Sequence, residues 1–454
     1  MIYLADGYFY VNGQFQWGAL QLDGPRIGAF QPIDPDIHFE PPLWDPLAKT
    51  MHLGGKYVLP GLIDVHVHFR DMDQKEKETI ETGSRAALHS GVTTVVNMPN
   101  TRPPATTPDV VAAWQILALK NCYVNVAFLS GVPPLSRRAA LNELVEKPIK
   151  GFKIYLYAAL QPENAWHQPE VLKKFLAFAQ EKNQLVCFHS DTFQPEGVRK
   201  QRYECSVLEG KSELEAHNET YPKQEEINAI RYILEQYKTL GNTHPIHFCH
   251  VSTPEAINRL LDAKREGLNA SWEVTPHHMF LSMKDHFNQA SFAKVLVPLR
   301  SEEARDGVFR HVAEGNVPII ATDHSPHTLK EKNQDFYKSP AGIPGVELLG
   351  PLILTEIFEG RLTEKILECI TSNPAERFNF TNKGRILPGY DADIAIFEKV
   401  DPYSIDPTVC FTKAKFSPYE QRALRARVTD VFLGGEFVLY QGTERLGPSG
   451  TVIS

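Results

Sequence analysis

Two histidines close a strongly apolar stretch near the start of the chain, and their types and spacing could bind a metal ion. Residues 57–67 form an apolar run typical of a buried strand, and it leads into His66-Val67-His68. Residues i and i+2 of a strand point to the same face, so His66 and His68 should project together. Imidazole nitrogens are common zinc ligands. Two polar residues that merely close a strand are the simpler interpretation, but further potential ligands elsewhere favour a metal site.

Those further ligands follow other predicted strands. Short apolar, β-branched segments alternate with helical stretches after residue 57, and polar side chains stand at the downstream ends of the segments. These side chains are Asn100, Lys153, His189, His250 and Asp323. In a barrel of parallel strands the carboxyl ends share one face, which carries the active site. One such residue could be an ordinary polar strand end, but a coincidence over six strands is improbable, so we predict that they converge.

The fold class follows from the same alternation, which predicts a (β/α)8 TIM-type barrel over residues 58–375. After the first strand, the expected strands are 92–97, 123–128, 151–155, 185–189, 245–250, 269–274 and 317–323, with helices at 75–90, 169–181 and 224–238. The flanking segments 1–57 and 376–454 show short strands and tight-turn pairs such as Asn12-Gly13 and Gly434-Gly435. Neither segment can build its own core, so we pair them in one small composite β-sandwich domain.

Composition and charge limit which binding partners and which cellular compartment we expect for the protein. The 454 residues are 42% hydrophobic and carry a net charge of -8 without a long basic block, which disfavours nucleic acid and membrane surfaces. Six scattered cysteines without a Cys-x-x-Cys pair fit a reducing compartment. We see no signal peptide and no membrane-spanning apolar run, so we expect a cytoplasmic protein. The sequence is compatible with a homodimer but does not determine the oligomeric state.

The number of potential ligands bears on the number of metal ions. Four histidines and Asp323 exceed what one zinc ion needs, so two ions with a bridging ligand fit better. Lys153 could supply the bridge if its amine were carboxylated to a carbamate, although a simple ion pair is slightly favoured by spacing alone. Two metals would lower the pKa of a shared water to roughly 7. Asp323 could then exchange its proton as general base and acid. The predicted chemistry is hydrolysis of an amide-like bond, or its reverse.

Four further polar residues near the predicted strand ends carry no assignment. Cys249 and Glu273 could be an extra soft ligand and an extra carboxylate, but a buried thiol and a structural carboxylate are the better interpretations. His277 and His278 could orient ligands or only cap a loop.

Seven motifs together resemble the dihydroorotase family of the amidohydrolase superfamily, over nearly the whole chain. They lie at residues 64–70, 98–104, 151–155, 250–253, 273–278, 323–328 and 342–345. The resemblance implies a binuclear zinc barrel of the carboxylated-lysine type, which interconverts N-carbamoyl-L-aspartate and (S)-dihydroorotate in pyrimidine biosynthesis. It assigns to the two zinc ions His66, His68, Lys153 as carboxylated bridge, His189, His250 and Asp323. It assigns to this small-molecule substrate Arg70, Asn100 and His327, with the backbone near Ala341 and Gly342 closing over it.

Two departures from the family pattern concern the substrate pocket. Asp71-Met72-Asp73 stands where members often have Glu-Pro-Gly, and Leu296-Val297 begins a segment that many members read as Asn-Pro-Pro-Leu-Arg. Arg70 could nevertheless grip a carboxylate through two parallel hydrogen bonds. Residues 329–342 have the composition of a mobile lid.

Two other functions compete with this interpretation. Hydantoinases, dihydropyrimidinases and allantoinases have a similar metal site but usually lack the arginine after the second histidine. A non-catalytic relative acting as a scaffold would typically have lost metal ligands, whereas all six expected positions are filled here. We therefore expect an enzyme that acts on a cyclic amide carrying a carboxylate.

Overall fold

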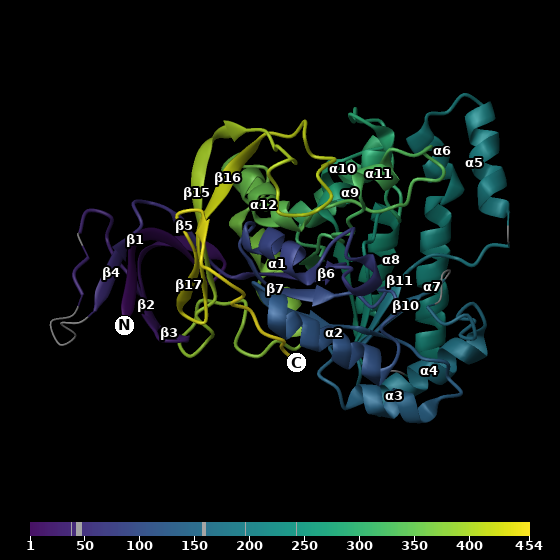
Figure 1. Ribbon diagram of the computed structural model, residues 1–454, viewed down its shortest axis with the longest axis horizontal. Coiled ribbons are helices and arrows are strands. Elements are labelled where there is room, and N and C mark those ends of the chain that lie inside the picture. Colours follow the sequence, from purple (N-terminus) through teal and green to yellow (C-terminus); the bar gives the residue numbers. More distant parts are fainter. Residues whose placement is uncertain (38, 42–47, 157–159, 196, 242) are drawn as a thin grey trace.

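A barrel of short parallel strands forms the larger part of the molecule, and a sheet built from both ends of the chain lies beside it (Figure 1). The computed structural model describes residues 1–37, 39–41, 48–156, 160–195, 197–241 and 243–454. Among these residues, no helix has both the length and the apolar character needed to cross a membrane.

The barrel confirms the predicted (β/α)8 class. Its strands are β6 (Leu62–Val67), β7 (Val92–Asn97), β8 (Asn125–Phe128), β9 (Ser130–Gly131), β10 (Phe152–Tyr155), β11 (Val186–His189), β12 (Ile246–Phe248), β13 (Ala270–Val274) and β14 (Ile319–Ile320). They pair in parallel as β6-β7-β8 and as β9 through β14 in order. The third barrel strand is split into β8 and β9, and Leu129 N between them donates to Asn97 O at 3.1 Å. A parallel bridge from Val67 to His324 closes the ring.

Helices alternate with the barrel strands and cover their outer side (Figure 1). They are α1 (Ile80–Leu88), α2 (Pro108–Asn121), α3 (Arg138–Val145), α4 (Pro169–Glu181), α5 (Val198–Leu208), α6 (Glu213–Thr220), α7 (Lys223–Thr239), α8 (Pro254–Arg265), α9 (Pro276–Phe280), α10 (Glu302–Ala313), α11 (Leu329–Lys332), α12 (Leu349–Phe358) and α13 (Ser372–Arg377). Thr107 and Thr253 cap α2 and α8 with their hydroxyls, just before a proline at the first turn. The helix expected at 75–90 begins only at Ile80, because Thr79 forms a capping box with Thr82.

The second sheet joins the two ends of the chain. It contains β1 (Ile2–Val11), β2 (Gln14–Asp23), β3 (Arg26–Pro32), β4 (Lys49–His52), β5 (Tyr57–Pro60), β15 (Ile394–Tyr403), β16 (Leu424–Leu433), β17 (Glu436–Tyr440) and β18 (Thr443–Glu444). Asn12-Gly13 and Gly434-Gly435 turn the hairpins β1–β2 and β16–β17, as expected, and all four residues have positive φ. β5 pairs in parallel with β1 and antiparallel with β15, so it connects the N-terminal strands to the C-terminal ones.

The apolar run at 57–67 was expected to be one strand, and that expectation is wrong. β5 ends at Pro60 and enters the terminal sheet, whereas β6 begins at Leu62 and enters the barrel. The break is at Gly61, where a Cβ atom would lie 2.1 Å from Thr93 Oγ1. Both strands are buried, so hydrophobicity alone could not separate them. The expected domain boundary between residues 57 and 58 therefore falls inside β5.

Candidate metal centre

A cavity of about 450 Å³ opens at the carboxyl ends of the barrel strands. It is lined by all the predicted site residues except Lys153, namely His66, His68, Arg70, Asn100, His189, His250, Asp323, His327, Ala341 and Gly342. These residues come from the ends of five strands, β6, β7, β11, β12 and β14, and from the segment after β14, as expected for the catalytic face of a barrel.

His66, His68 and Asp323 converge on one point of this cavity. Asp323 Oδ1 lies 3.2 Å from His66 Nε2 and 3.0 Å from His68 Nε2. The three side chains are buried and form one of two groups of potential metal ligands in the described part of the chain. A histidine pair on one strand thus meets a carboxylate that is distant in sequence.

The contacts of the Nδ1 atoms show where the imidazole rings of His66 and His68 carry their protons. His66 Nδ1 faces a carboxylate oxygen of Glu273, and His68 Nδ1 lies 2.6 Å from Asn100 Oδ1. A carboxylate and an amide oxygen can only accept, so both Nδ1 atoms carry the proton. In the neutral rings, both Nε2 atoms then turn lone pairs toward Asp323 Oδ1. Three facing lone pairs repel unless a cation lies between them, so this donor set fits a metal ion.

His189 and His250 form a second imidazole pair beside the first. His189 Nδ1 lies 2.8 Å from His250 Nε2, and the rings of His250 and His66 are 5.4 Å apart between centroids. His250 Nδ1 is buried without a hydrogen-bond partner among the described residues. Burial lowers the pKa of His189 to about 3 and that of His68 to about 4, so both rings are neutral at pH 7. The neutral ring is the form that binds metal.

Lys153 lies deeper than the other predicted ligands. Its side chain extends from β10 into the barrel, where only 1% of the residue is exposed, and Nζ donates to Cys249 Sγ at 2.7 Å. Within the described residues Lys153 has no carboxylate within ion-pair distance. The simple ion pair, which spacing had slightly favoured, is therefore not formed.

Three residues of the site have left-handed backbone conformations. The φ angles are +51° at Arg70, +39° at His250 and +48° at Asp323. Side chains other than glycine and asparagine rarely adopt this region, and such strain is concentrated at functional sites. Arg70 and Asp323 lie three residues after the ends of β6 and β14, and His250 lies two residues after the end of β12. All three side chains line the cavity.

Arg70 and His327, two of the predicted substrate residues, line the same cavity and have partners of their own. Arg70 is 6% exposed, and its Nη2 donates to Ser325 Oγ at 2.5 Å. His327 Nε2 lies 3.1 Å from Ala341 O, and its Nδ1 lies 3.3 Å from Lys77 Nζ. Among the predicted substrate residues, His327 thus contacts Ala341, whereas Asn100 contacts His68.

Sequence reasoning missed several residues of the site. His247 on β12 lies 2.9 Å from the second oxygen of Glu273, so Glu273 links two imidazoles. Ser325 and Lys77 contact Arg70 and His327. A histidine within the apolar strand 246–248 was a detectable signal for a buried polar network. Nothing in the sequence marked Lys77 among its charged neighbours.

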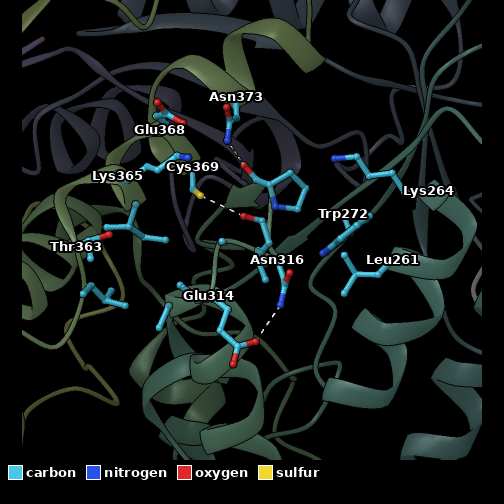
Figure 2. A pocket seen from close by; sticks show the side chains of 17 residues that line it. Leu261, Lys264, Trp272, Glu314, Asn316, Thr363, Lys365, Glu368, Cys369 and Asn373 are labelled. Atoms are coloured by element: carbon cyan, nitrogen blue, oxygen red, sulfur yellow. Dashed lines mark hydrogen bonds between the residues drawn. The ribbon is translucent and has the colours of Figure 1, made fainter. Parts of the chain in front are cut away.

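A second pocket, of about 360 Å³, lies at the opposite end of the barrel, beside the residues that precede β14 (Figure 2). Cys369 Sγ donates to Val317 O at 3.2 Å, and Asn373 Nδ2 donates to Pro318 O at 2.9 Å, as the dashed lines show. None of the predicted site residues lines this pocket. The amino-terminal face of such barrels usually serves stability, which leaves the first cavity as the candidate site.

Comparisons with known proteins agree with the architecture. The sequence matches the amidohydrolase family over residues 57–285 and 357–438. It is 35% identical to a dihydroorotase of Methanosphaera stadtmanae, over 80% of this chain and 81% of that protein. It is also 35% identical to a dihydroorotase of Pyrococcus abyssi, over 85% and 84%. Among solved structures, an L-hydantoinase from Arthrobacter aurescens superimposes with a TM-score of 0.89 at 22% identity, covering 100% of this chain and 99% of that one.

The low identity to the hydantoinase makes that likeness evidence for the fold alone. The family match covers most of the chain, and the two dihydroorotases match most of it at the higher identity of 35%. Enzymes of this family typically depend on metal ions, in agreement with the ligand groups described above. This protein therefore belongs to the amidohydrolase family.

Proposed function

We propose that this protein is a dihydroorotase, which interconverts (S)-dihydroorotate and N-carbamoyl-L-aspartate in pyrimidine biosynthesis in the cytoplasm. The single observation that carries the proposal is the environment of Arg70. Its guanidinium is buried at the wall of the cavity that contains His66, His68 and Asp323. Arg70 Nε is buried without a hydrogen-bond partner in the described part of the chain.

A buried arginine normally has an acidic partner, because burial of an unpaired charge is costly. Within the described ranges, Arg70 has a hydroxyl partner, Ser325, but no carboxylate within ion-pair distance. The missing anion would come from the substrate. Dihydroorotate carries a carboxylate on its ring, and N-carbamoyl-L-aspartate keeps this carboxylate in addition to the one that closes the ring, whereas hydantoin, dihydrouracil and allantoin have no carboxylate. The unpaired arginine therefore favours dihydroorotase over the alternative cyclic amidohydrolases.

The proposed metal ligands divide into two groups around one bridge. His66, His68 and Asp323 would bind one zinc ion, and His189 and His250 would bind the other. Lys153, carboxylated by carbon dioxide at Nζ, would reach both as an anionic carbamate. Carboxylation converts a buried cation into an anion, which removes its repulsion from the metals. The remaining N–H could still donate to Cys249 Sγ, which lies 2.7 Å from Nζ.

Two divalent ions would supply Lewis acidity, polarising the reacting amide carbonyl and lowering the pKa of water. The residues of the chain would supply the rest. Asp323 would take the proton from the attacking water and pass it to the departing amide nitrogen, and it would run these transfers in reverse during ring closure. Asp323 would begin as the carboxylate, which is the form that can accept this proton. Arg70, Asn100 and His327 would hold the substrate carboxylate, with the backbone at Ala341 and Gly342 over it.

A turnover assay tests the proposal directly. Purified, zinc-loaded protein is offered dihydroorotate, dihydrouracil, hydantoin and allantoin at equal concentrations, and N-carbamoyl-L-aspartate is offered for the reverse reaction. We expect dihydroorotate to have the highest kcat/KM by several orders of magnitude. A higher kcat/KM for one of the three uncharged rings would replace the dihydroorotase assignment with that activity.

A further inference from the structure

Two buried lysines outside the proposed catalytic residues, Lys294 and Lys332, contact the segment that forms one side of the cavity. Their exposed fractions are 7% and 0%. Lys294 precedes Val295 and Leu296, which line the cavity, and Lys332 ends α11. Among the residues that the structure describes, neither amine has a carboxylate within ion-pair distance. Burial of a cation without a counter-ion is costly, so other groups must stabilise these amines.

Backbone carbonyls of one short segment bind the amine of Lys294. Its Nζ donates to Phe336 O at 2.7 Å, to Tyr337 O at 3.1 Å and to Ser339 O at 2.6 Å. A lysine ammonium has three donors, and all three are used here. Burial lowers the pKa of Lys294 to about 8, so the amine is still mainly the ammonium at pH 7. The three hydrogen bonds therefore attach the backbone of residues 336–339 to Lys294.

The next residues along the chain are attached to the same two lysines. Lys332 Nζ donates to Pro340 O at 2.9 Å and to Lys294 O at 3.3 Å, and Gly342 N donates to Lys294 O at 2.9 Å. Pro340, Ala341 and Gly342 all line the catalytic cavity. This part of the cavity wall is therefore held by hydrogen bonds on both sides of Ala341.

Aromatic packing supports the segment from the side of α5 and α6. Phe336 is 3% exposed, and its ring centroid lies 6.1 Å from that of Tyr203 in α5 and 5.9 Å from that of His217 in α6. His217 Nε2 lies 2.9 Å from Val295 O, and a carbonyl can only accept, so this nitrogen donates. His217 thus contacts both the segment that carries Lys294 and the segment that its ammonium binds.

We propose that Lys294 is a positioning residue for the substrate, which holds residues 336–342 as a fixed wall of the cavity before the substrate binds. The composition of residues 329–342 predicts a mobile lid, whereas a wall that is already in place costs no ordering when the substrate arrives. Its effect on catalysis rests on the proposed function, in which Ala341 and Gly342 close over the substrate, but its rigidity does not. Lys294 contacts no reacting atom, so its loss should weaken substrate binding more than it slows the chemical step.

Hydrogen exchange of the substrate-free protein tests the rigidity of the wall without reference to turnover. Exchange of the backbone amides in peptides that cover residues 335–343 is followed in the wild type, in Lys294→Met and in Lys338→Met. Methionine keeps an apolar stem but removes the donors. One hydrogen bond from a charged donor is worth roughly tenfold or more in an opening equilibrium, so exchange in Lys294→Met should be at least about tenfold faster. Lys338→Met is the matched control, because Lys338 is an exposed lysine of the same segment, and its exchange should equal that of the wild type.

Steady-state kinetics test the consequence for the substrate, with the cyclic amide that the wild type turns over best. We expect KM to rise about tenfold in Lys294→Met while kcat changes by less than about twofold, and both constants to stay unchanged in Lys338→Met. A general structural defect would instead lower kcat through loss of active protein.

Three results would overturn the proposal. Rapid exchange of residues 336–342 in the substrate-free wild type would show a mobile lid, and this measurement needs no variant to fold. Equal exchange in Lys294→Met and the wild type would remove the role of the ammonium. A fall in kcat at constant KM would exclude a positioning role toward the substrate. None of these results decides which cyclic amide is the substrate, since that depends on the turnover assay.

Discussion

Replacement of Arg70 by methionine should separate substrate recognition from metal binding. Methionine keeps much of the apolar volume of the arginine side chain but removes its charge and all its donors. The substrate carboxylate would then keep only Asn100, His327 and the Ser325 hydroxyl as polar partners in the cavity. Loss of one partner of a buried, hydrogen-bonded charge pair costs about 2–5 kcal/mol. A loss of about 3–4 kcal/mol corresponds to a roughly 10²- to 10³-fold fall in kcat/KM for dihydroorotate.

The assay compares kcat/KM for dihydroorotate and dihydrouracil in the wild type and in Arg70→Met, together with zinc content. We expect the preference for the acid to shrink by the same factor while zinc content stays constant. Arg102→Met is the control, because Arg102 lines the same cavity but is exposed to solvent, and its loss should have a far smaller effect. An unchanged preference in Arg70→Met would refute the role of Arg70, and a loss of zinc would place Arg70 in support of the metal site.

Three further perturbations give distinct outcomes. Asp323→Asn should fold but lose nearly all turnover, because an amide cannot carry the proton of the attacking water; a variant that kept most of its kcat would move that role elsewhere. Lys153→Ala should lose both metal and activity, and a short carboxylic acid should restore part of each; full metal content without added acid would refute the bridge. Burial lowers the pKa of His217 to about 3, so only the unfolded chain binds this proton between about pH 6.5 and 3, and stability falls as the pH falls through that range. His217→Gln should therefore show a shallower loss of Tm from pH 6.5 to 4 than the wild type, and parallel Tm curves would contradict this.

The barrel could be predicted because apolar residues repeat with different periods in its strands and in its helices. Residues that begin or end an element, such as proline, separate the two kinds of segment. The helix at 169–181 was predicted to the residue, since a proline begins it and the apolar positions follow the helical period. The strand at 92–97 was also predicted to the residue. The junction at Gly61 was not, because two consecutive buried strands belong to different sheets without any change in composition. The helix that begins at Ile80 was overextended, because a capping box of two threonines is a weaker signal than Ser or Thr followed by Glu.

The candidate site, too, could be predicted only in part from the sequence. Residues at strand ends, such as His66 and Asp323, could be identified because the topology alone brings strand ends together. The contacts of Glu273 with His66 and His247 depend on which side chains face inward at one level of the barrel. Those levels are set by the stagger between strands, which a single sequence does not specify. The stagger between strands also explains why the contact of Lys153 with Cys249, instead of with a carboxylate, could not be predicted.

The place of β5 in the terminal sheet has a consequence for the synthesis of the protein. β5 pairs with β1 on one side and with β15 on the other, and the whole barrel is translated between β5 and β15. At roughly 5–20 residues per second, the ribosome needs on the order of tens of seconds to cover that distance. Throughout this interval β5 presents an unpaired, apolar edge, the kind of edge that promotes aggregation. This edge of β5 is covered only after β15 has been synthesised, so a stop codon before β15 would leave it permanently open.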